Sequence, residues 1–349
     1  MNFSRNQIIG SLILLAAIIF FCLCKNISEQ IEFSGFVFKN KKNPIFAIVG
    51  PTASGKTELG VELALKLGSG EVINCDSVQI YKEIKIATAK PSKEEMKGVP
   101  HHLIDYVPPA INYTAAAWAE DAGRKIREIE SRGKIPILVG GTGFYLRTLR
   151  EPLFEAPKTD NKLRARLTAL RERKGAEHLH KILCRIDRKS AGKLFPRDYP
   201  RVQRALEVYF QTGRKLSELQ PKRKPPPEFA DRIKVFVLNP PRKILYETIN
   251  KRAVRHFENG LVEEVKSLRD EGLPDTTNAL GSHGYRRVCE YLRGLRTLES
   301  AIEKTQQDVR NYAKRQISWF KREKTAIWLE GFGNQTAIQE ELFKQIDPD

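Results

Sequence analysis

The feature that most constrains the fold of this chain is the motif GPTASGKT at residues 50–57. It matches the pattern G-x-x-x-x-G-K-[ST], in which a loop between a buried strand and a helix binds phosphate groups. The apolar residues 43–49 precede the motif, and a helical pattern of Leu, Val and Ala follows it. We therefore predict a strand, a phosphate-binding loop (the P-loop) and a helix, which form the first unit of a parallel α/β sheet.

The residue types of the P-loop suit it to bind phosphate. The loop consists of Gly50, Pro51, Thr52, Ala53, Ser54, Gly55, Lys56 and Thr57. Gly50 and Gly55 allow turns that point backbone N–H groups inward, and the next helix adds the positive end of its dipole. Lys56 can place a charge on the outer phosphates, and the Thr57 hydroxyl can bind Mg²⁺. We expect a polyphosphate or pyrophosphate ligand with Mg²⁺, and the motif alone leaves the reaction open.

Two further apolar segments are expected to be strands of the same sheet. Residues 71–76 end on Asp76, and residues 134–139 run into the sequence GGTG, which contains Thr142. Ligands of open α/β sheets bind beyond the carboxyl ends of the strands, so both residues should face the P-loop. Asp76 could hold Mg²⁺, act as a general base or cap the following turn. The second segment does not end on an acid, which weakens an ATP-hydrolysing interpretation.

The positive charge of the chain is concentrated in one segment. Residues 158–224 hold 20 basic and 7 acidic residues, a net charge of +13 out of +18 for the whole chain. Leu and Ile recur there at helical spacing, with basic residues between them. A solvated helical face gives the same pattern. The concentration of charge nevertheless favours a helical insertion that binds RNA.

An apolar, uncharged run occupies residues 8–24. It lies at the short end of the roughly 17–25 residues that a transmembrane helix needs. The lysines that follow it would place the downstream part of the chain in the cytoplasm. A membrane anchor and an over-extended translation start both remain open, whereas a cleaved signal peptide fits less well because no cleavage site follows. The five cysteines form no C-x-x-C pair, which excludes a disulfide framework and fits a reducing compartment.

Longer motifs occur along the rest of the chain. They are DSVQIYKEIKIATAKPS (76–92), VPHHLIDYVPP (99–109), PILVGGTGFYLRTL (136–149), RVQRALEVYFQTG (201–213), YETINKR (246–252), GLVEEVKSL (260–268), GYRRVCEYLRG (284–294) and RNYAKRQISWFKRE (310–323). In this order they resemble the tRNA dimethylallyltransferases, also called tRNA isopentenyltransferases, over residues 44–329. The chain departs from that family at Val78, where Met is usual, and at His283, where an apolar residue is usual. No zinc finger of the eukaryotic kind follows, so the bacterial form is expected.

The resemblance implies a reaction and a catalytic set. A dimethylallyl group would pass from dimethylallyl pyrophosphate to N6 of the adenosine that is 3′-adjacent to the anticodon, with Mg²⁺ as cofactor. Asp76 would be the general base, Arg252 a pyrophosphate contact and Thr142 a contact to the tRNA. The target base would have to leave the stack of the anticodon loop to enter the pocket.

The resemblance also implies a tRNA interface. Its expected residues are Asp76, Ser77, Val78, Gln79, Thr142, Arg164, Pro200, Arg201, Val202, Gln203 and Arg204. The partners would be the anticodon stem-loop of tRNA and dimethylallyl pyrophosphate. The Gln79 amide has the donor and the acceptor needed to read a base edge.

We expect a P-loop NTPase-like parallel sheet flanked by helices, with a helical insertion domain. Residues 1–43 would be an apolar extension, 44–157 and 225–330 the catalytic core, 158–224 the basic insertion and 331–349 a tail. The protein is expected to act as a monomer in the cytoplasm, with residues 8–24 as a candidate membrane contact.

Two other classes of protein remain open on the sequence. A P-loop kinase of a small metabolite would share the loop and the sheet but would have no use for the basic insertion. A non-catalytic, membrane-tethered RNA-binding protein would use the apolar run and the basic face, but not Lys56, Thr57 and Asp76 together.

Two groups of residues invite functional interpretations that we consider weaker. His101 and His102 have no Cys or His partner at metal-ligand spacing, which favours a structural loop. Tyr312, Trp319, Phe320 and Trp328 are expected to pack a helix onto the sheet rather than to stack on RNA.

Overall fold

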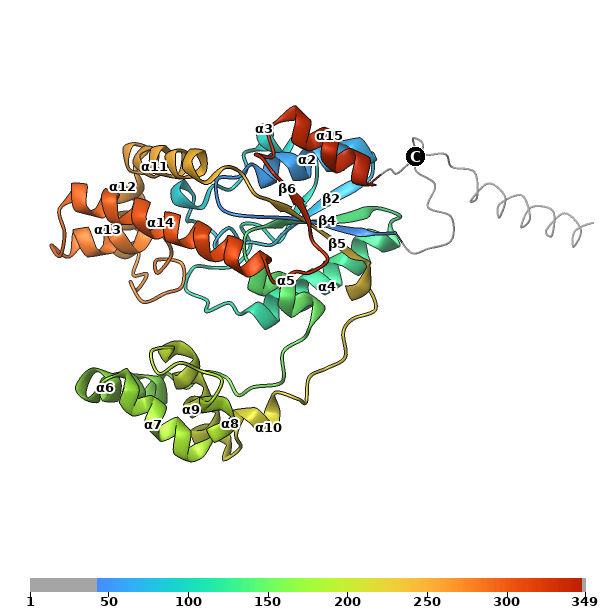
Figure 1. Cartoon of the computed structure of the whole chain (residues 1–349). Coiled ribbons are helices and arrows are strands. Elements are labelled where there is room, and N and C mark those ends of the chain that lie inside the picture. The colour runs from blue at the N-terminus through green and yellow to red at the C-terminus, as the bar shows by residue number, and fades with distance from the viewer. Residues whose placement is uncertain (1–42, 347–349) are drawn as a thin grey trace, which may run out of the picture.

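The computed structural model describes residues 43–346, and within this range six strands form one sheet. The strands are β1 (Ile45–Val49), β2 (Gly70–Asn74), β3 (His101–His102), β4 (Ile135–Gly140), β5 (Ile233–Leu238) and β6 (Ile327–Leu329). They lie in the order β3-β2-β4-β1-β5-β6, and each pairing is parallel (Figure 1). The predicted P-loop NTPase-like sheet is confirmed.

The helices of the described residues fall into three groups. Around the sheet lie α2 (Lys56–Leu67), α3 (Lys93–Met96), α4 (Ala115–Ser131), α5 (Gly143–Arg150) and α15 (Thr336–Ile346). Beyond its carboxyl edge lie α11 (Arg242–Glu258), α12 (Leu261–Asp270), α13 (Tyr285–Leu292) and α14 (Leu298–Phe320). Between α5 and β5 the chain forms α6 (Asn161–Lys174), α7 (Ala176–Ile186), α8 (Arg188–Ala191), α9 (Tyr199–Thr212) and α10 (Leu216–Leu219). Short 3₁₀ helices are η1 (Ile86–Thr88) and η2 (Ala230–Arg232).

Alternation of side chains along β1 divides the core into two layers. Phe46 and Ile48 point to the face that α2 and α15 cover. Ile45, Ala47 and Val49 point to the opposite face, which α4 and α5 cover. A strand covered on both faces must be apolar at every position, and for this reason residues 43–49 read as a continuous apolar run.

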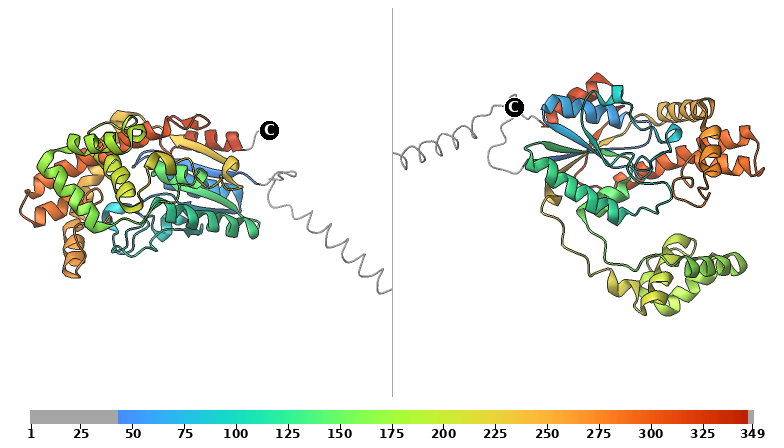
Figure 2. Two further views of the ribbon diagram at one scale, coloured as in Figure 1. Left: turned by 90° about the horizontal axis from the view of Figure 1, so that it is seen from below. Right: turned by 180° about the vertical axis from the view of Figure 1, so that it is seen from behind.

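The segment between α5 and β5 forms a separate helical lobe, as predicted. Its helices bury their Leu, Val and Ala side chains in a cluster of their own, distinct from the clusters on the two faces of the sheet. Two extended connectors join this lobe to the core (Figures 1 and 2). A bridge between Phe154 and Arg223 pairs the two connectors, and Phe154 packs against the cluster of the lobe.

The segment expected to be a tail differs from that expectation. Residues 336–346 form α15, whose buried side chains Ile338, Leu342 and Ile346 join the layer beneath α2. Just before α15, the Gly333 N–H donates to the Ser54 carbonyl oxygen at 2.9 Å. The chain end therefore supports the back of the P-loop. Its amphipathic pattern was too short to be recognised as part of the core without the fold.

The apolar run at residues 8–24 lies outside the described residues. None of the helices within residues 43–346 is long and apolar enough to cross a membrane.

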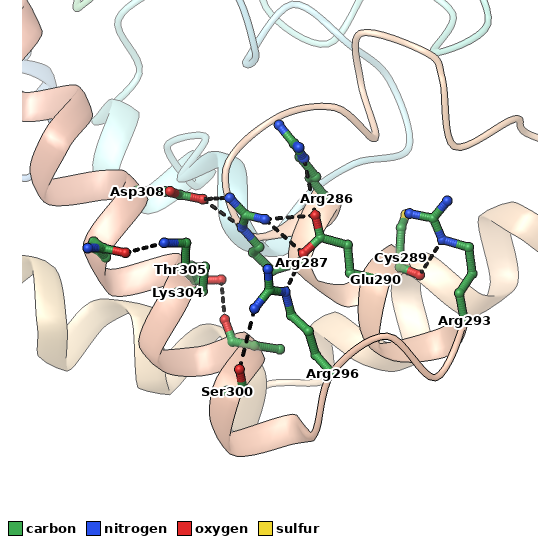
Figure 3. Close-up of polar contacts among 12 residues, drawn as sticks. Arg286, Arg287, Cys289, Glu290, Arg293, Arg296, Ser300, Lys304, Thr305 and Asp308 are labelled. Atoms are coloured by element: carbon green, nitrogen blue, oxygen red, sulfur yellow. Dashed lines mark hydrogen bonds and ion pairs between the residues drawn. The ribbon is translucent and has the colours of Figure 1, made fainter. Parts of the chain in front are cut away.

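A buried ion network holds α13 against α14 (Figure 3). Arg287 donates to Glu290 at 2.7 Å and to Asp308 at 2.7 Å, and Arg296 also donates to Glu290. Burial opposes the charge of Glu290, but hydrogen bonds from Arg296 and Arg287 hold its pKa at about 2. The network joins α13 to α14 and to the loop that follows α13, and α13 itself begins directly after His283 and Gly284.

The aromatic residues near the chain end have different roles. Phe320 is fully buried and Trp328 packs against the same cluster, as expected of residues that join a helix to the sheet. Tyr312 lines a cavity at the carboxyl edge of the sheet instead. Trp319 is only partly buried and lies beside the exposed Phe144. For Tyr312 and Trp319 the expectation of simple packing is therefore incomplete.

Candidate functional site

The P-loop leaves β1 and enters α2 through two glycines that no other residue could replace without strain. At Gly50 a Cβ atom would lie 2.8 Å from the Leu238 carbonyl oxygen. Gly55 has a φ of 82°, the left-handed region, and caps α2 without a side-chain hydrogen bond. The first amides of α2 are thus open to an anion, and the positive end of the helix dipole favours one.

Two side chains of the loop, Lys56 and Ser54, have no anionic partner within residues 43–346. Lys56 donates to the Pro51 carbonyl oxygen at 2.6 Å. Burial, with a smaller contribution from Arg252, lowers the pKa of Lys56 to about 8, although the charge of Asp76 opposes the shift. The buried Ser54 Oγ has no hydrogen-bond partner among the described residues. An anion in the loop would satisfy Ser54 and favour the charged form of Lys56.

Asp76 and Thr142 meet because they follow neighbouring strands. β2 pairs with β4, so the segments after both strands lie at one edge of the sheet. The Ser77 N–H donates to Thr142 Oγ1 at 3.0 Å, and Thr142 Oγ1 donates to Ser77 Oγ at 3.2 Å. Asp76 Oδ1 accepts from the Val78 N–H at 2.9 Å, so this carboxylate does cap the following turn. Its second oxygen, Oδ2, has no partner in residues 43–346.

Gln316 connects the P-loop to the loop that contains Thr142, and sequence reasoning missed it. This α14 residue is 4% exposed. Its Oε1 accepts from the Thr52 N–H at 2.8 Å, and its Nε2 donates to the Gly141 carbonyl oxygen at 2.8 Å. The Gln316 side chain therefore sets the spacing of the two loops. Its place inside the motif RNYAKRQISWFKRE was a signal, but one without a chemical meaning until the fold was known.

Arg252 reaches the same edge of the sheet from α11. Burial lowers the pKa of Arg252, while the charge of Asp76 acts in the opposite direction. Arg252 Nε donates to His256 Nε2 at 3.4 Å. Burial and the neighbouring guanidinium lower the pKa of His256 to about 4, so this imidazole is neutral at pH 7 and can accept that hydrogen bond.

Two cavities adjoin one another at these residues. The first follows the P-loop as far as Glu58, and the second lies between α11, α14 and the loop before α13. Residues that line both cavities are Thr52, Ala53, Asp76, Thr88 and Arg252. Ile249, Ala253 and Val309 give the second cavity an apolar wall. A polar anion site and an apolar chamber are thus joined at Asp76 and Arg252.

His283, the unusual residue noted in the sequence, lines the apolar chamber. Its ring lies 4.7 Å from the ring of Tyr312. Burial and the charge of Arg315 lower its pKa, which favours a neutral ring. Histidine at position 283, where the family usually has an apolar residue, therefore adds polar ring atoms to the wall of this chamber.

The segment 76–79 lies at the site, but one of its expected roles is limited. Val78 lines the apolar chamber and Gln79 lines the P-loop cavity. The Gln79 amide donates to the carbonyl oxygens of Ala89 at 2.8 Å and Thr88 at 3.2 Å. Its N–H groups are thus occupied within the chain, and only its carbonyl oxygen remains to read a base.

The expected tRNA-interface residues of the insertion differ in exposure: some face solvent and others are buried. Pro200 and Arg201 are exposed. Val202 is fully buried and Gln203 is 5% exposed, so their side chains form the interior of the lobe and do not face a partner. Helical periodicity explains this, because successive residues of α9 point to different sides.

Arg164 and Arg204 serve the fold of the insertion. Arg164 forms a bidentate ion pair with the fully buried Glu207: Nε donates to Oε1 at 2.7 Å and Nη2 to Oε2 at 3.0 Å. These hydrogen bonds raise the pKa of Arg164. Arg204 donates to the Pro157 carbonyl oxygen at 2.7 Å. Any contact of these guanidinium groups to RNA would be additional to a structural role.

His101 and His102 form the edge strand β3 rather than a loop, and their contacts are structural. His102 Nε2 lies 2.7 Å from Glu71 Oε2, and His101 Nδ1 lies 2.8 Å from the Val99 carbonyl oxygen. The part of the chain that is described contains no group of three or more His, Cys, Asp or Glu residues that could hold a metal ion.

Comparison with known proteins gives matches along most of the chain. The family described as IPP transferase matches residues 79–323, and the family described as isopentenyl transferase matches residues 43–111. The tRNA dimethylallyltransferase of Solibacter usitatus is 44% identical over 303 residues, which cover 87% of this chain and 98% of the relative. That of Koribacter versatilis is 45% identical over 303 residues, which cover 86% and 97%.

Two solved structures have a similar fold. One is the full-length tRNA isopentenylpyrophosphate transferase of Bacillus halodurans, with a TM-score of 0.63 and 36% identity over 88% of this chain and 97% of that chain. The other is a eukaryotic dimethylallyltransferase acting on tRNA, with a TM-score of 0.67 and 30% identity over 82% of this chain and 74% of that chain.

Proposed function

This chain belongs to the tRNA dimethylallyltransferase family, and we propose that it transfers a dimethylallyl group from dimethylallyl pyrophosphate to tRNA. The acceptor is N6 of the adenosine that is 3′-adjacent to the anticodon. The observation that carries this proposal is the junction of the anion site and the apolar chamber at Asp76 and Arg252. A metabolite kinase and a non-catalytic RNA-binding protein, the alternatives left open by the sequence, are set aside by family membership.

The P-loop would bind the leaving group. The α2 amides, Lys56 and Arg252 offer positive charge to the pyrophosphate, on which negative charge grows as the C–O bond breaks. Arg252 adds a planar fork that suits phosphate oxygens. The apolar wall of Ile249, Ala253 and Val309 would receive the five-carbon chain. The same wall keeps water away from an allylic carbon that acquires cationic character.

Asp76 would accept the proton of the attacking amine. Its Oδ1 is held by the Val78 N–H, which fixes the carboxylate, and Oδ2 remains available. The lone pair of the adenine amine is delocalised into the ring, so removal of its proton during attack lowers the barrier. Thr142, held by Ser77, stands beside Asp76 and is proposed to contact the incoming nucleotide.

Prenyl-pyrophosphate transferases generally need a divalent metal ion, and we propose Mg²⁺ at Thr57. The fit rests on the donor set, because Thr57 and Asp76 line the same cavity as the P-loop amides. Mg²⁺ usually takes one or two protein ligands and completes its shell with phosphate oxygens and water. When bound, it would supply further positive charge to the departing pyrophosphate.

The basic insertion is proposed to hold the anticodon stem. Its exposed cations would pair with backbone phosphates, while the unpaired loop presents its bases to the core. We further propose that the protein acts as a monomer. A tRNA substrate is consistent with action in the cytoplasm.

The test is transfer of label from dimethylallyl pyrophosphate to tRNA, followed by the same assay on Asp76→Asn. Asparagine keeps the oxygen that caps the turn but removes the base, so turnover should fall about 10²–10⁴-fold while both substrates still bind. Asp231→Asn, which changes an exposed carboxylate in η2, is the matched control. Near-normal turnover of Asp76→Asn would remove Asp76 from the mechanism. With ATP added to the same assay, ADP released in step with turnover would contradict the prenyl-transfer reaction itself.

A further inference from the structure

A separate cavity lies where α5, the end of α14 and the start of the insertion connector come together. Its lining residues come from 147–151 and 319–325. Figure 1 shows α5 and the end of α14 side by side, on the side of the core from which the insertion hangs. None of the roles proposed above uses this cavity.

One aromatic residue, Trp319, lines this cavity, and Phe144 packs beside it. Phe144 is 43% exposed, and its ring meets that of Trp319 edge to face, with centroids 6.0 Å apart. The Arg322 guanidinium lies over the Trp319 ring at 5.6 Å. The Trp319 Nε1–H has no hydrogen-bond partner in the described residues, and Trp319 is only partly buried. Phe144, Trp319 and Arg322 are called the aromatic platform below.

The aromatic platform is joined directly to the proposed catalytic site. A Cβ atom at Gly143 would lie 2.1 Å from Trp319 Cδ1, so the indole rests on the backbone of the residue that follows Thr142. One turn earlier on α14, Gln316 holds the P-loop and the Gly141 carbonyl oxygen. The platform therefore has a fixed position relative to the site.

Positive charge exceeds negative charge around the platform. Arg147 pairs with Glu151 at 3.4 Å and Arg150 with Glu323 at 2.7 Å. Arg322 and Lys324 have no carboxylate partner within residues 43–346. A partner that combines a flat apolar surface with negative charge would satisfy both the rings and these cations.

We infer that the aromatic platform stacks an unpaired nucleotide of the tRNA anticodon loop, one other than the modified adenosine. This inference rests on the proposed function. Unpaired RNA bases stack on aromatic and guanidinium planes, and their phosphates pair with Arg and Lys. Once the target adenosine has left the loop's stack, its neighbours lose a stacking partner, and the platform replaces that partner. The contact would hold the loop open at the site.

The experiment compares Phe144→Leu and Trp319→Leu with the unaltered protein, using an anticodon stem-loop RNA. Leucine keeps the apolar character but removes the ring, so stem-loop affinity should fall about 5- to 100-fold in each variant. The KM for dimethylallyl pyrophosphate should not change. Phe343→Leu is the matched control, because Phe343 also has a cation near its ring, Lys66 at 5.8 Å, but lies on the layer of α2 and α15.

A set of stem-loops with one abasic loop position at a time identifies the stacked nucleotide. The unaltered protein should lose affinity at one position besides the target, and Phe144→Leu should be insensitive to the same change. Unchanged stem-loop affinity and an unchanged abasic profile in Phe144→Leu would overturn the inference, since this exposed residue can be altered without loss of the fold. If the unaltered protein binds the stem-loop but transfers no prenyl group, the proposed function fails while the stacking test still stands.

Discussion

Replacement of Gln316 by methionine should weaken both the fold and the pyrophosphate site. Methionine matches the length of the side chain and leaves little cavity, so the loss of hydrogen bonds is isolated from the loss of packing. In the unaltered protein the Thr52 N–H and the Gly141 carbonyl oxygen are each bonded at 2.8 Å to Gln316, which is 4% exposed. The change leaves both backbone groups without a partner.

The magnitude follows from those two backbone groups. An orphaned buried group costs about 1–3 kcal/mol, and water that enters from the P-loop side would recover part of that cost. We therefore expect the free energy of unfolding to fall by about 2–4 kcal/mol. Because Thr52 belongs to the P-loop, the KM for dimethylallyl pyrophosphate should rise as well.

Urea unfolding and steady-state kinetics measure the two effects. Gln306→Met is the matched control on the same helix, because Gln306 makes one longer hydrogen bond, at 3.3 Å to the Asn250 carbonyl oxygen. A Gln316→Met protein within about 0.5 kcal/mol of the unaltered one, the range of ordinary surface changes, would refute the assigned role.

Two further predictions concern charge. Burial lowers the pKa of Lys56 to about 8, so this side chain loses its proton as pH rises, and kcat/KM for dimethylallyl pyrophosphate should fall as pH rises through about 8. Lys56→Met should lower kcat/KM and abolish this decrease near pH 8; a decrease that persists in the variant would belong to another group. Reversal of the exposed Arg173, Lys174 and Arg185 to Glu should weaken tRNA binding. The slope of log affinity against log salt concentration should become shallower by roughly 0.7–0.9 per lost phosphate contact. An unchanged slope would show that these side chains face solvent and do not contact tRNA. Arg164 is left out of this set because its loss would strand the buried Glu207.

The sequence alone determined the parts of the site whose geometry is local. A strand, the P-loop and a helix are consecutive in the chain, so residue types and spacing are enough to predict the anion site. Asp76 and the loop with Thr142 follow apolar segments, and the rule that parallel strands end at one edge brought them together. The position of Arg252 came from the resemblance to the family, because a helix residue far along the chain has no such rule.

Only the tertiary structure decided which side chains face which neighbour. Gln316 bonds to Thr52 across 264 positions of the chain, and such a contact leaves no local pattern. Val202 and Gln203 stand beside exposed basic residues in sequence but point into the insertion, because a helix turns its neighbours to different sides. Arg164 was expected at the tRNA interface by resemblance, and only the fold shows that it pairs with the buried Glu207. Burial and long-range pairing depend on how helices and strands pack against one another. The sequence of a single helix or strand does not show which neighbour each of its side chains will meet.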